Sequence, residues 1–366
     1  MKLGLIGIGV MAENYIRLIV ENRIQGAQIC ALCSRSAQHL QTVKEKYQLD
    51  GTRLFSDPAE MCASGTIDAV IICTPHLQHL EIASIAVAHD IHVLIEKPMA
   101  VSPAEAEAFC ALLALHPKVV CGIAYCRRTA PVFQKAKEIR AQLGSLKRAV
   151  WIVTNMHRSD AYYHSASWRG TYRGEGGGVL LNQISHALDL YFWLCGAPQS
   201  VHAFCVNGAE RDIEVENDAA LYFLFANQAT GQLVASTREF PGTDRLEIIG
   251  ANGQMIIENG SKITWNQLTT PEPVCAHTCT ENEPKIPYTQ QIFSFENNME
   301  QQWSSIVNDF IEAVALGVSP ICSAGEGLLS VQVLSAAYLS SWTDTTQPVP
   351  CDADAFMQNL QARQKK

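Results

Sequence analysis

Residues 3–12 of this chain have the sequence Leu-Gly-Leu-Ile-Gly-Ile-Gly-Val-Met-Ala, which is the strongest indication of the fold class. The apolar run Leu3–Ile6 predicts a buried strand, and the apolar spacing over Ala12–Asn22 predicts a helix. Between them, Gly7-Ile8-Gly9-Val10-Met11-Ala12 matches the pattern Gly-x-Gly-x-x-Ala. In that pattern the first glycine permits a tight turn, and the second lets the backbone approach a pyrophosphate group. The stretch therefore predicts a dinucleotide site at a helix N-terminus, with an unrelated glycine-rich turn as the alternative.

Outward from this stretch, strands and helices alternate as far as residue 123. Further strands are expected at Ala27–Leu32, Ala69–Cys73, His92–Ile95 and Val119–Gly122, and further helices at Gln38–Tyr47, Leu77–Ala88 and Pro103–Leu115. Strands that are apolar on both faces and separated by helices are typical of a parallel sheet covered on both sides. We therefore predict a Rossmann dinucleotide-binding domain over residues 1–123.

The pattern changes after residue 128. Strand-like stretches now follow one another with few helices between them, at Ala149–Met156, Ser200–Val206, Ala219–Phe225, Gln232–Phe240, Leu246–Gly250 and Gln254–Glu258. Hairpin turns join some of them, which favours a mostly antiparallel sheet. Helices are expected at Val132–Leu143, Leu180–Leu194, Gln301–Leu316 and Gly325–Ser341, and a long surface loop at Thr269–Thr289. The predicted fold is thus α/β followed by an α+β domain over residues 124–345, with a C-terminal tail over residues 346–366.

The composition limits the partners of the chain. Lys and Arg number 27 and Asp and Glu 36, which gives a net charge of −9 over 366 residues. An acidic chain is a poor candidate for sequence-independent binding to nucleic acid or to an anionic membrane, so neither partner is expected. No apolar run approaches the roughly 18 residues of a membrane span. The 13 cysteines are scattered and odd in number, which indicates a reducing, cytoplasmic environment.

The end of the second expected strand bears on the choice of cofactor. Enzymes that use NAD usually place Asp or Glu there, where the carboxylate binds the ribose 2′-hydroxyl. This chain has Cys33-Ser34-Arg35-Ser36, with no carboxylate. Ser34 can donate a hydrogen bond to a phosphate, and Arg35 can pair with a 2′-phosphate. The sequence therefore favours NADP(H) over NAD(H), and a solvated charge at the strand end is the alternative for Arg35.

Two further motifs follow later strands of the expected parallel sheet. Cys73-Thr74-Pro75-His76, with His79 three residues on, comes after one strand, and Glu96-Lys97-Pro98 comes after the next. Open α/β sheets bind their ligands at the carboxyl ends of the strands. A lysine beside a nicotinamide can hydrogen-bond the reacting oxygen and stabilise its charge. Lys97 is therefore a candidate catalytic residue, and the alternative is an ordinary surface charge.

The segment before the expected helix at Leu180–Leu194 suits a sugar-like ligand. Tyr163, Trp168 and Arg169 offer aromatic faces for stacking and a guanidinium for polar groups. Gly176-Gly177-Gly178 allow backbone close to a ligand, and Asn182 and His186 lie four residues apart on one helix face. Histidine is the natural proton carrier near neutral pH. The alternatives are packing beneath a loop for the aromatic residues and a satisfied core position for His186.

These motifs together resemble the Gfo/Idh/MocA oxidoreductases. The resemblance rests on residues 7–12, Thr74-Pro75, Glu96-Lys97-Pro98 and the segment Gly176–His186, and it runs nearly from end to end. It implies an open, mostly antiparallel second sheet whose outer face mediates oligomers, so a homodimer or homotetramer is expected. It also implies that His186 exchanges a proton with the substrate and that Lys97 assists beside the nicotinamide. Many members carry Asp where this chain has Asn182, which is better read as a residue that positions substrate.

The resemblance implies the function as well. We expect an NAD(P)-dependent oxidoreductase that moves hydride between nicotinamide and a secondary alcohol or ketone of a sugar, polyol or related cyclic compound. Thr74, Pro75, His76, His79 and Glu96 are expected beside the cofactor. Two alternatives remain: an NAD-dependent glycosidase that oxidises its substrate transiently, and a non-enzymatic regulator that binds the dinucleotide. Cys275-x-His277-x-Cys279 offers one ligand too few for a tetrahedral metal site, so no metal is expected.

Overall fold

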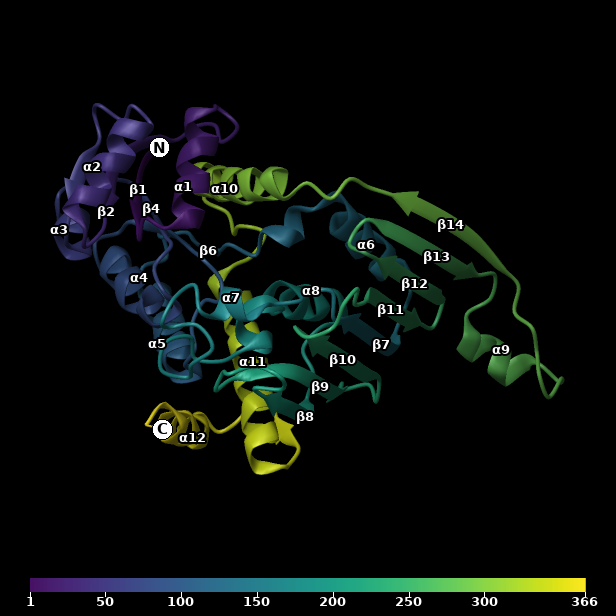
Figure 1. Ribbon diagram of the computed structural model, residues 1–366. Coiled ribbons are helices and arrows are strands. Elements are labelled where there is room, and N and C mark those ends of the chain that lie inside the picture. Colours follow the sequence, from purple (N-terminus) through teal and green to yellow (C-terminus); the bar gives the residue numbers. More distant parts are fainter. Residues whose placement is uncertain (366) are drawn as a thin grey trace. The chain divides into compact units, whose positions relative to one another are not determined.

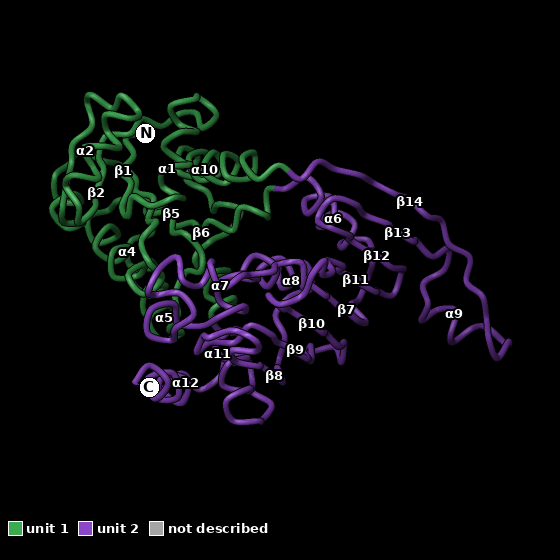
Figure 2. Tube along the Cα trace, in the orientation of Figure 1, with its two compact units in different colours: residues 1–129, 298–331 green, residues 130–297, 332–366 purple. Residues whose placement is uncertain are grey.

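The computed structural model describes residues 1–365, which form two compact units (Figures 1 and 2). Unit 1 consists of Met1–Thr129 and Asn298–Val331. Unit 2 consists of Ala130–Asn297 and residues 332–365. Each unit is built around a sheet of its own, as the sequence predicts.

Unit 1 is a Rossmann fold. Within residues 1–365 its sheet has six strands in the order β3-β2-β1-β4-β5-β6, and neighbouring strands run parallel. The strands are β1 (Lys2–Ile6), β2 (Gln28–Cys33), β3 (Arg53–Phe55), β4 (Ala69–Ile72), β5 (His92–Ile95) and β6 (Cys121–Ile123). The helices are α1 (Val10–Val20), α2 (Ala37–Lys46), α3 (Pro58–Ala63), α4 (His79–Ala88), α5 (Pro103–Leu115) and α10 (Met299–Leu316), while α11 (Ala324–Thr343) begins in unit 1 and continues into unit 2. The predicted parallel sheet is confirmed.

The central strand β4 shows why this sheet is covered on both faces. Val70 and Ile72 pack into one apolar cluster, and Ala69 and Ile71 pack into the cluster on the opposite face. All four side chains are fully buried. A strand with no polar face is stable only between two layers of helices, which is the arrangement that the continuous apolar run predicts.

Helix α10 belongs to unit 1 although it lies far along the chain. Ile306, Val307 and Phe310 are buried in the same cluster as Leu3 and Ile16. The division of the chain therefore differs from a single boundary near residue 123, because the apolar face of α10 covers the first sheet. The spacing of apolar residues predicts such a helix but does not say which sheet it covers.

Unit 2 is built on a mixed, mostly antiparallel sheet. In the described part of the chain it has nine strands in the order β14-β13-β12-β11-β7-β10-β9-β8-β15, and only the β7–β10 pair is parallel. The strands are β7 (Leu146–Val153), β8 (Ser200–Asn207), β9 (Glu216–Leu224), β10 (Thr230–Ser236), β11 (Asp244–Gly250), β12 (Gly253–Glu258), β13 (Lys262–Leu268), β14 (Tyr288–Ser294) and β15 (Gln347–Pro348). The helices are α6 (Pro131–Gln142), α7 (Asp160–Tyr163), α8 (Ser185–Cys195), α9 (Glu272–Thr278) and α12 (Ala353–Gln364).

The outer edge of this sheet departs from the sequence-based expectation. Figure 1 shows β13 and β14 at the edge, with α9 in the connection between them. Helix α9 and the first residues of β14 fall within Thr269–Thr289, which was expected to be a loop. Nearly every side chain of β14 is exposed, so the strand carries no alternation of apolar and polar residues that could predict it. Among the helices described, none combines the length and apolarity needed to cross a bilayer.

Candidate active site

The turn between β1 and α1 has the shape that the glycine motif predicts. Gly7 has a φ of +84°, and a side chain there would press on the backbone nitrogen of Thr74 at 2.7 Å. At Gly9 an added Cβ would meet no atom of the described chain within 4 Å. Gly9 also precedes α1, and no side chain in residues 1–365 caps that end of the helix. The turn thus presents uncovered backbone at a positive helix end, which suits the pyrophosphate of a dinucleotide.

The loop after β4 brings Thr74 to the same turn. The Thr74 hydroxyl oxygen is buried and has no hydrogen-bond partner in the described residues. Buried hydroxyl groups are normally paired, so an unpaired one beside an open turn fits a site completed by a ligand. The residues present therefore fit the dinucleotide that the motif predicts.

His79 packs against the loop that carries Thr74. Its ring is fully buried, with Nδ1 2.9 Å from the Pro98 carbonyl oxygen and Nε2 2.8 Å from the Thr74 carbonyl oxygen. Burial lowers the pKa of His79 and favours the neutral ring, which donates to one of these two carbonyls. The structure thus places His79 between the loops that follow β4 and β5, while His76 lies in the short 3₁₀ turn before α4.

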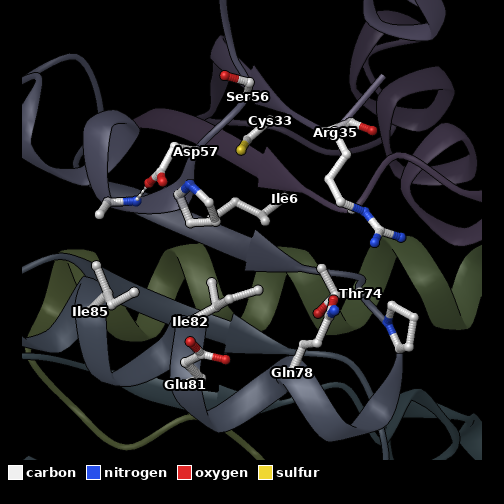
Figure 3. A pocket seen from close by; sticks show the side chains of 15 residues that line it. Ile6, Cys33, Arg35, Ser56, Asp57, Thr74, Gln78, Glu81, Ile82 and Ile85 are labelled. Carbon is white, nitrogen blue, oxygen red and sulfur yellow. Dashed lines mark hydrogen bonds between the residues drawn. The ribbon is translucent and has the colours of Figure 1, made fainter. Parts of the chain in front are cut away.

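A pocket of about 360 Å³ lies beside the glycine turn in unit 1 (Figure 3). Ser34 and Arg35 at the end of β2 line it, together with Thr74 and Pro75. Its volume falls within the roughly 300–1,000 Å³ typical of small-molecule sites. The sequence-predicted cofactor residues of β1, β2 and β4 therefore come together around one cavity.

Two carboxylates that belong to none of the sequence motifs also line this pocket. Figure 3 shows Asp57 across the pocket from Arg35, with Glu81 on the α4 side. Asp57 is the N-cap of α3, where its Oδ1 accepts hydrogen bonds from the backbone nitrogens of Ala59 at 2.6 Å and Glu60 at 3.2 Å. The Asp-Pro pair at 57–58 signals a helix start, but only the fold brings that helix beside the end of β2.

Glu96 lies beneath the loop that carries Lys97. Its Oε1 accepts a hydrogen bond from the hydroxyl of Tyr15 on α1 at 2.5 Å, and its Oε2 accepts one from the Lys97 backbone nitrogen at 3.2 Å. Burial raises the pKa of the Glu96 carboxyl. The carboxylate thus ties the end of β5 to the helix that follows the glycine turn. Lys97 itself is half-buried, at the carboxyl end of the strand.

The second glycine segment, in unit 2, packs against the protein itself. A side chain at Gly177 would collide with the Tyr338 hydroxyl, and one at Gly178 would collide with the backbone carbonyl of Glu216. The Glu216 carboxylate accepts hydrogen bonds from the backbone nitrogens of Gly178 and Leu180 at 3.0 Å and from the Tyr338 hydroxyl at 2.8 Å. Burial raises the pKa of Glu216 to about 7. This carboxylate therefore holds the segment that leads to Asn182.

Asn182 does not lie on a regular α-helix. Residues Val179–Gln183 form a π-helical turn, and α8 begins only at Ser185, whereas one continuous helix was expected. The side-chain amide of Asn182 donates a hydrogen bond to buried Glu175, which also accepts one from the Gly170 backbone nitrogen. His186 stands half-buried in the first turn of α8. Single π-turns are frequent at functional sites, so their presence here agrees with a ligand-binding role.

The aromatic segment places Tyr162, and not Tyr163, beside Arg169. The Tyr163 hydroxyl lies 3.1 Å from the Thr237 hydroxyl in the interior of unit 2. The Tyr162 hydroxyl accepts a hydrogen bond from Arg169 Nη1 at 2.6 Å, and the Arg169 guanidinium also lies over the Trp168 ring at 4.5 Å. The structure thus gathers Tyr162, Trp168 and Arg169 and points Tyr163 elsewhere. Helix α7 is four residues long, and the sequence alone does not fix which of its two tyrosines faces the arginine.

No metal centre is found in the described part of the chain. Within residues 1–365, no group of three or more His, Cys, Asp or Glu side chains is placed to hold a metal ion. Cys275 lies on α9 and Cys279 at its C-terminal end.

Comparison with known protein families identifies the class. Residues 1–124 match the model of an oxidoreductase family with an NAD-binding Rossmann fold, and residues 133–256 match the model of the Gfo/Idh/MocA C-terminal domain. The chain therefore belongs to the Gfo/Idh/MocA oxidoreductases, and unit 1 contains their NAD-binding Rossmann domain. The family resemblance and the enzyme class predicted from the sequence are confirmed.

Individual relatives are distant but match over much of their length. The chain is 25% identical to the rhizopine catabolism protein MocA of Rhizobium meliloti over 258 residues, which is 69% of this chain and 76% of that protein. It is 22% identical to myo-inositol 2-dehydrogenase of Thermotoga maritima, over 92% of this chain and 95% of that protein. Among solved structures, the WlbA dehydrogenase of Bordetella pertussis in complex with NADH and UDP-GlcNAcA has a TM-score of 0.77 and 24% identity, and the match covers 96% of this chain and 99% of that one. This last likeness establishes the fold.

Proposed function

We propose that this protein is an NAD(P)-dependent dehydrogenase that transfers hydride between nicotinamide and a secondary alcohol or ketone of a sugar, polyol or related cyclic compound. Two observations carry the proposal: the open space at Gly9, at the uncapped start of α1, and the unpaired hydroxyl of Thr74, a residue that lies against Gly7 of the same turn. Relatives named as inositol dehydrogenases support the choice of a polyol-type substrate.

Lys97, His186 and Asn182 have separate roles in this proposal. When bound, the nicotinamide accepts or gives the hydride at C4. The Lys97 ammonium hydrogen-bonds the substrate oxygen and stabilises its developing negative charge. His186 takes up the hydroxyl proton in oxidation and returns it in reduction. The amide of Asn182, held by Glu175, positions a substrate hydroxyl and transfers no proton.

Steady-state kinetics of Lys97→Ala and His186→Ala test these roles. Each change is expected to lower kcat by roughly 10²–10⁴-fold, because general acid–base groups contribute about that much. Binding of NADPH, followed by fluorescence titration, is expected to persist in both variants. The matched controls are Lys118→Gln and His89→Ala, which alter exposed side chains of unit 1 outside the proposed site. Near wild-type turnover in either test variant would refute the role assigned to that residue.

We also propose that NADP(H) is preferred over NAD(H). Arg35 is exposed at the pocket and makes no ion pair with a carboxylate in residues 1–365. Asp57 and Glu81, which line the same pocket, oppose this preference through their negative charges, but Asp57 Oδ1 already accepts two backbone hydrogen bonds at a helix N-terminus. The charge of Asp57 is therefore partly compensated, while the guanidinium of Arg35 remains available for a 2′-phosphate.

The ratio of kcat/KM with NADPH to kcat/KM with NADH tests this preference. Arg35→Gln is expected to lower the NADPH value by roughly tenfold and to leave the NADH value unchanged, since only NADPH carries the 2′-phosphate. Asp57→Asn is expected to raise the ratio, because it removes a negative charge from the pocket. Lys118→Gln again serves as the control for a general change of charge. Equal loss with both cofactors in Arg35→Gln would rule out a role for Arg35 in selectivity.

We propose further that the protein is a homodimer or homotetramer in the cytoplasm. One face of β8 and β9 exposes Phe204 (61%), Val206 (51%) and Leu224 (43%), and such apolar side chains suit a contact between subunits. No disulfide bond joins any of the 13 cysteines in residues 1–365, which supports a reducing compartment. Light scattering of Phe204→Glu is expected to show a smaller particle than the wild type, and an unchanged mass would exclude this face as the interface.

A further inference from the structure

Four side chains of unit 2 form a group that we name the donor cluster: Arg158, Tyr162, Arg169 and Gln183. The Arg158 and Arg169 guanidinium carbons lie 4.9 Å and 4.4 Å from the centre of the Tyr162 ring. The Tyr162 hydroxyl accepts hydrogen bonds from Arg169 Nη1 at 2.6 Å and from Gln183 Nε2 at 3.2 Å. Trp168 stacks on the guanidinium of Arg169 and holds it in place.

The donor cluster has more hydrogen-bond donors than acceptors. As placed, the Gln183 amide donates to the Tyr162 oxygen, so the Tyr162 hydroxyl proton has no acceptor in residues 1–365. If the Gln183 amide is turned over, its oxygen accepts that proton, and the buried Gln183 NH₂ group then lacks an acceptor. The Nε atoms of Arg158 and Arg169 are also buried without a hydrogen-bond partner in the described chain. As placed, Gln183 Oε1 is also buried without a partner in the described chain, but in either orientation the Nε–H groups of Arg158 and Arg169 still lack acceptor oxygens.

The positive charge of the donor cluster also points to a ligand with acceptor oxygens. Neither Arg158 nor Arg169 forms an ion pair with a carboxylate within residues 1–365, although the whole chain has a net charge of −9. Two guanidinium groups against one ring repel each other unless a negative charge lies near them. An arginine held by stacking presents its remaining N–H groups in a fixed fork, which matches the paired oxygens of a carboxylate or phosphate.

The donor cluster adjoins the segment that carries Asn182. Gln183 is the next residue in the π-helical turn. Arg169 precedes Gly170, whose backbone nitrogen donates to Glu175, and Glu175 accepts the hydrogen bond from the Asn182 amide. A ligand group held by the donor cluster would therefore belong to the same molecule whose hydroxyl Asn182 positions.

We propose that the donor cluster binds an anionic oxygen group of the substrate, a carboxylate or a phosphate, and so selects acidic sugars over neutral ones. This inference rests on the proposed dehydrogenase function and narrows its substrate class. Arg169 and Tyr162 contact the anion directly, Arg158 adds charge, and Gln183 fixes the Tyr162 hydroxyl. The donor cluster contains none of the residues to which hydride or proton transfer is assigned, so its proposed role is in substrate binding.

Matched sugar pairs provide the test. Isothermal titration of the cofactor-saturated protein compares D-glucuronate with D-glucose, D-galacturonate with D-galactose, and D-glucose 6-phosphate with D-glucose. At least one acidic member is expected to bind roughly tenfold or more tightly than its neutral partner, because a charge-assisted hydrogen bond contributes about that much. Preference for the uronates identifies a carboxylate ligand, and preference for the sugar phosphate identifies a phosphate ligand.

Two variants and one control assign the effect to the donor cluster. Arg169→Gln is expected to remove the preference for the acid and, where turnover is observed, to raise KM while leaving kcat unchanged. Tyr162→Phe keeps the ring for stacking, removes the hydroxyl and is expected to weaken binding of the acid alone. Arg173→Gln changes an exposed arginine four residues away, and the preference should survive in this control.

The outcomes separate this inference from the proposed function. Equal binding of the acidic and neutral members, or an equal loss for both in Arg169→Gln, would overturn the anion site even if nicotinamide is reduced by neutral sugars. Binding of the acid that is lost in Arg169→Gln would support the anion site even if no sugar reduced the cofactor, and the absence of reduction would then count against the dehydrogenase. Failure of every acid to bind more tightly than its neutral partner would also overturn the anion site.

Discussion

The glycine turn at residues 7–12 in unit 1 and the glycine run Gly176–Gly178 in unit 2 look alike in the sequence but face different neighbours. Gly9 has open space where a side chain would stand, whereas Gly178 touches the backbone of Glu216. At Gly9 the first segment leaves backbone uncovered by the described chain, which fits a ligand site. The second is already filled by Tyr338 and by the Glu216 carboxylate.

This difference shows that glycine-rich segments can arise for two different physical reasons. Glycine is required wherever backbone must come close to another group. At Gly178 that group is the protein, and at Gly9 we propose that it is the dinucleotide. The glycine run was expected to make room for a ligand, but the contacts in the structure show that it makes room for β9 and α11. Substitutions in the two segments should therefore affect different measurements.

The largest effect is expected from Gly178→Ala. Its Cβ would overlap the Glu216 carbonyl in β9, and a strand backbone cannot move aside cheaply. We expect the free energy of unfolding to fall by roughly 3–5 kcal/mol in urea titrations. Gly325→Ala is the control, because the nearest atom to its Cβ would lie 3.9 Å away. If Gly178→Ala were as stable as the control, the close contact between Gly178 and the Glu216 backbone would not be required for the fold.

The next effect concerns the pH dependence of the Glu216 carboxylate. Burial raises its pKa to about 7 in the folded state, above the roughly 4.3 of an unfolded chain. The protonated form therefore favours folding, and this contribution is complete below the unfolded pKa and is lost as the pH rises through 7. Relative to Glu216→Gln, the unfolding free energy of the wild type should fall by about 3 kcal/mol between pH 5 and 8. A difference that is constant or grows with pH would contradict the raised pKa.

In contrast to Gly178→Ala, Gly9→Ala should weaken cofactor binding and leave the stability of the fold nearly unchanged. The new methyl group meets only open space in the described chain, so we expect the free energy of unfolding to change by less than about 1 kcal/mol. The methyl group would block the approach of the pyrophosphate, and we expect the Kd for NADPH to rise roughly tenfold or more. Fluorescence titration measures this change. An unaltered Kd would mean that the open turn does not face the cofactor.

The smallest effect is expected from Thr74→Val. The substitution keeps the shape of the side chain and removes a buried hydroxyl that has no partner in residues 1–365. Stability should stay the same or rise by up to about 1 kcal/mol, because an unpaired buried polar group is lost. The Kd for NADPH should rise roughly fivefold, the value of one neutral hydrogen bond. If Thr74→Val instead lowered the free energy of unfolding by about 1 kcal/mol and left the Kd for NADPH unchanged, the hydroxyl would stabilise the fold and not bind the cofactor.

Much of the fold can be predicted from the sequence because buried strands and helices have characteristic patterns of apolar residues. The apolar runs of β1, β4 and β5 predict the parallel sheet with few errors in their ends. Strand β3 is three residues long, and β14 has exposed side chains on both faces, so neither has such a pattern. Helix α12 lies in the stretch expected to be a tail, and α10 was expected in the other domain. Which sheet a helix covers depends on distant contacts that local spacing does not encode.

The candidate site was predicted to a lesser degree. Motifs fixed by backbone geometry, such as the turn at Gly7, are recognisable because few other residues fit. Asp57 and Tyr162 were missed because their roles depend on where a helix start or a four-residue helix is placed. His79 was expected beside the cofactor, and the structure gives it carbonyl partners on two loops. The roles of Lys97 and His186 remain predictions.

The return of the chain to the first sheet through α10 has a consequence for protein engineering. A gene fragment that stops at Thr129 would encode every strand of that sheet yet omit Ile306, Val307 and Phe310, which shield its apolar side from water. Such a fragment should be insoluble. A chimera that takes unit 1 from this protein and unit 2 from a homologue must therefore include both Met1–Thr129 and Asn298–Val331. A chimera with a single crossover would separate the strands of the first sheet from helix α10, which covers one face of that sheet.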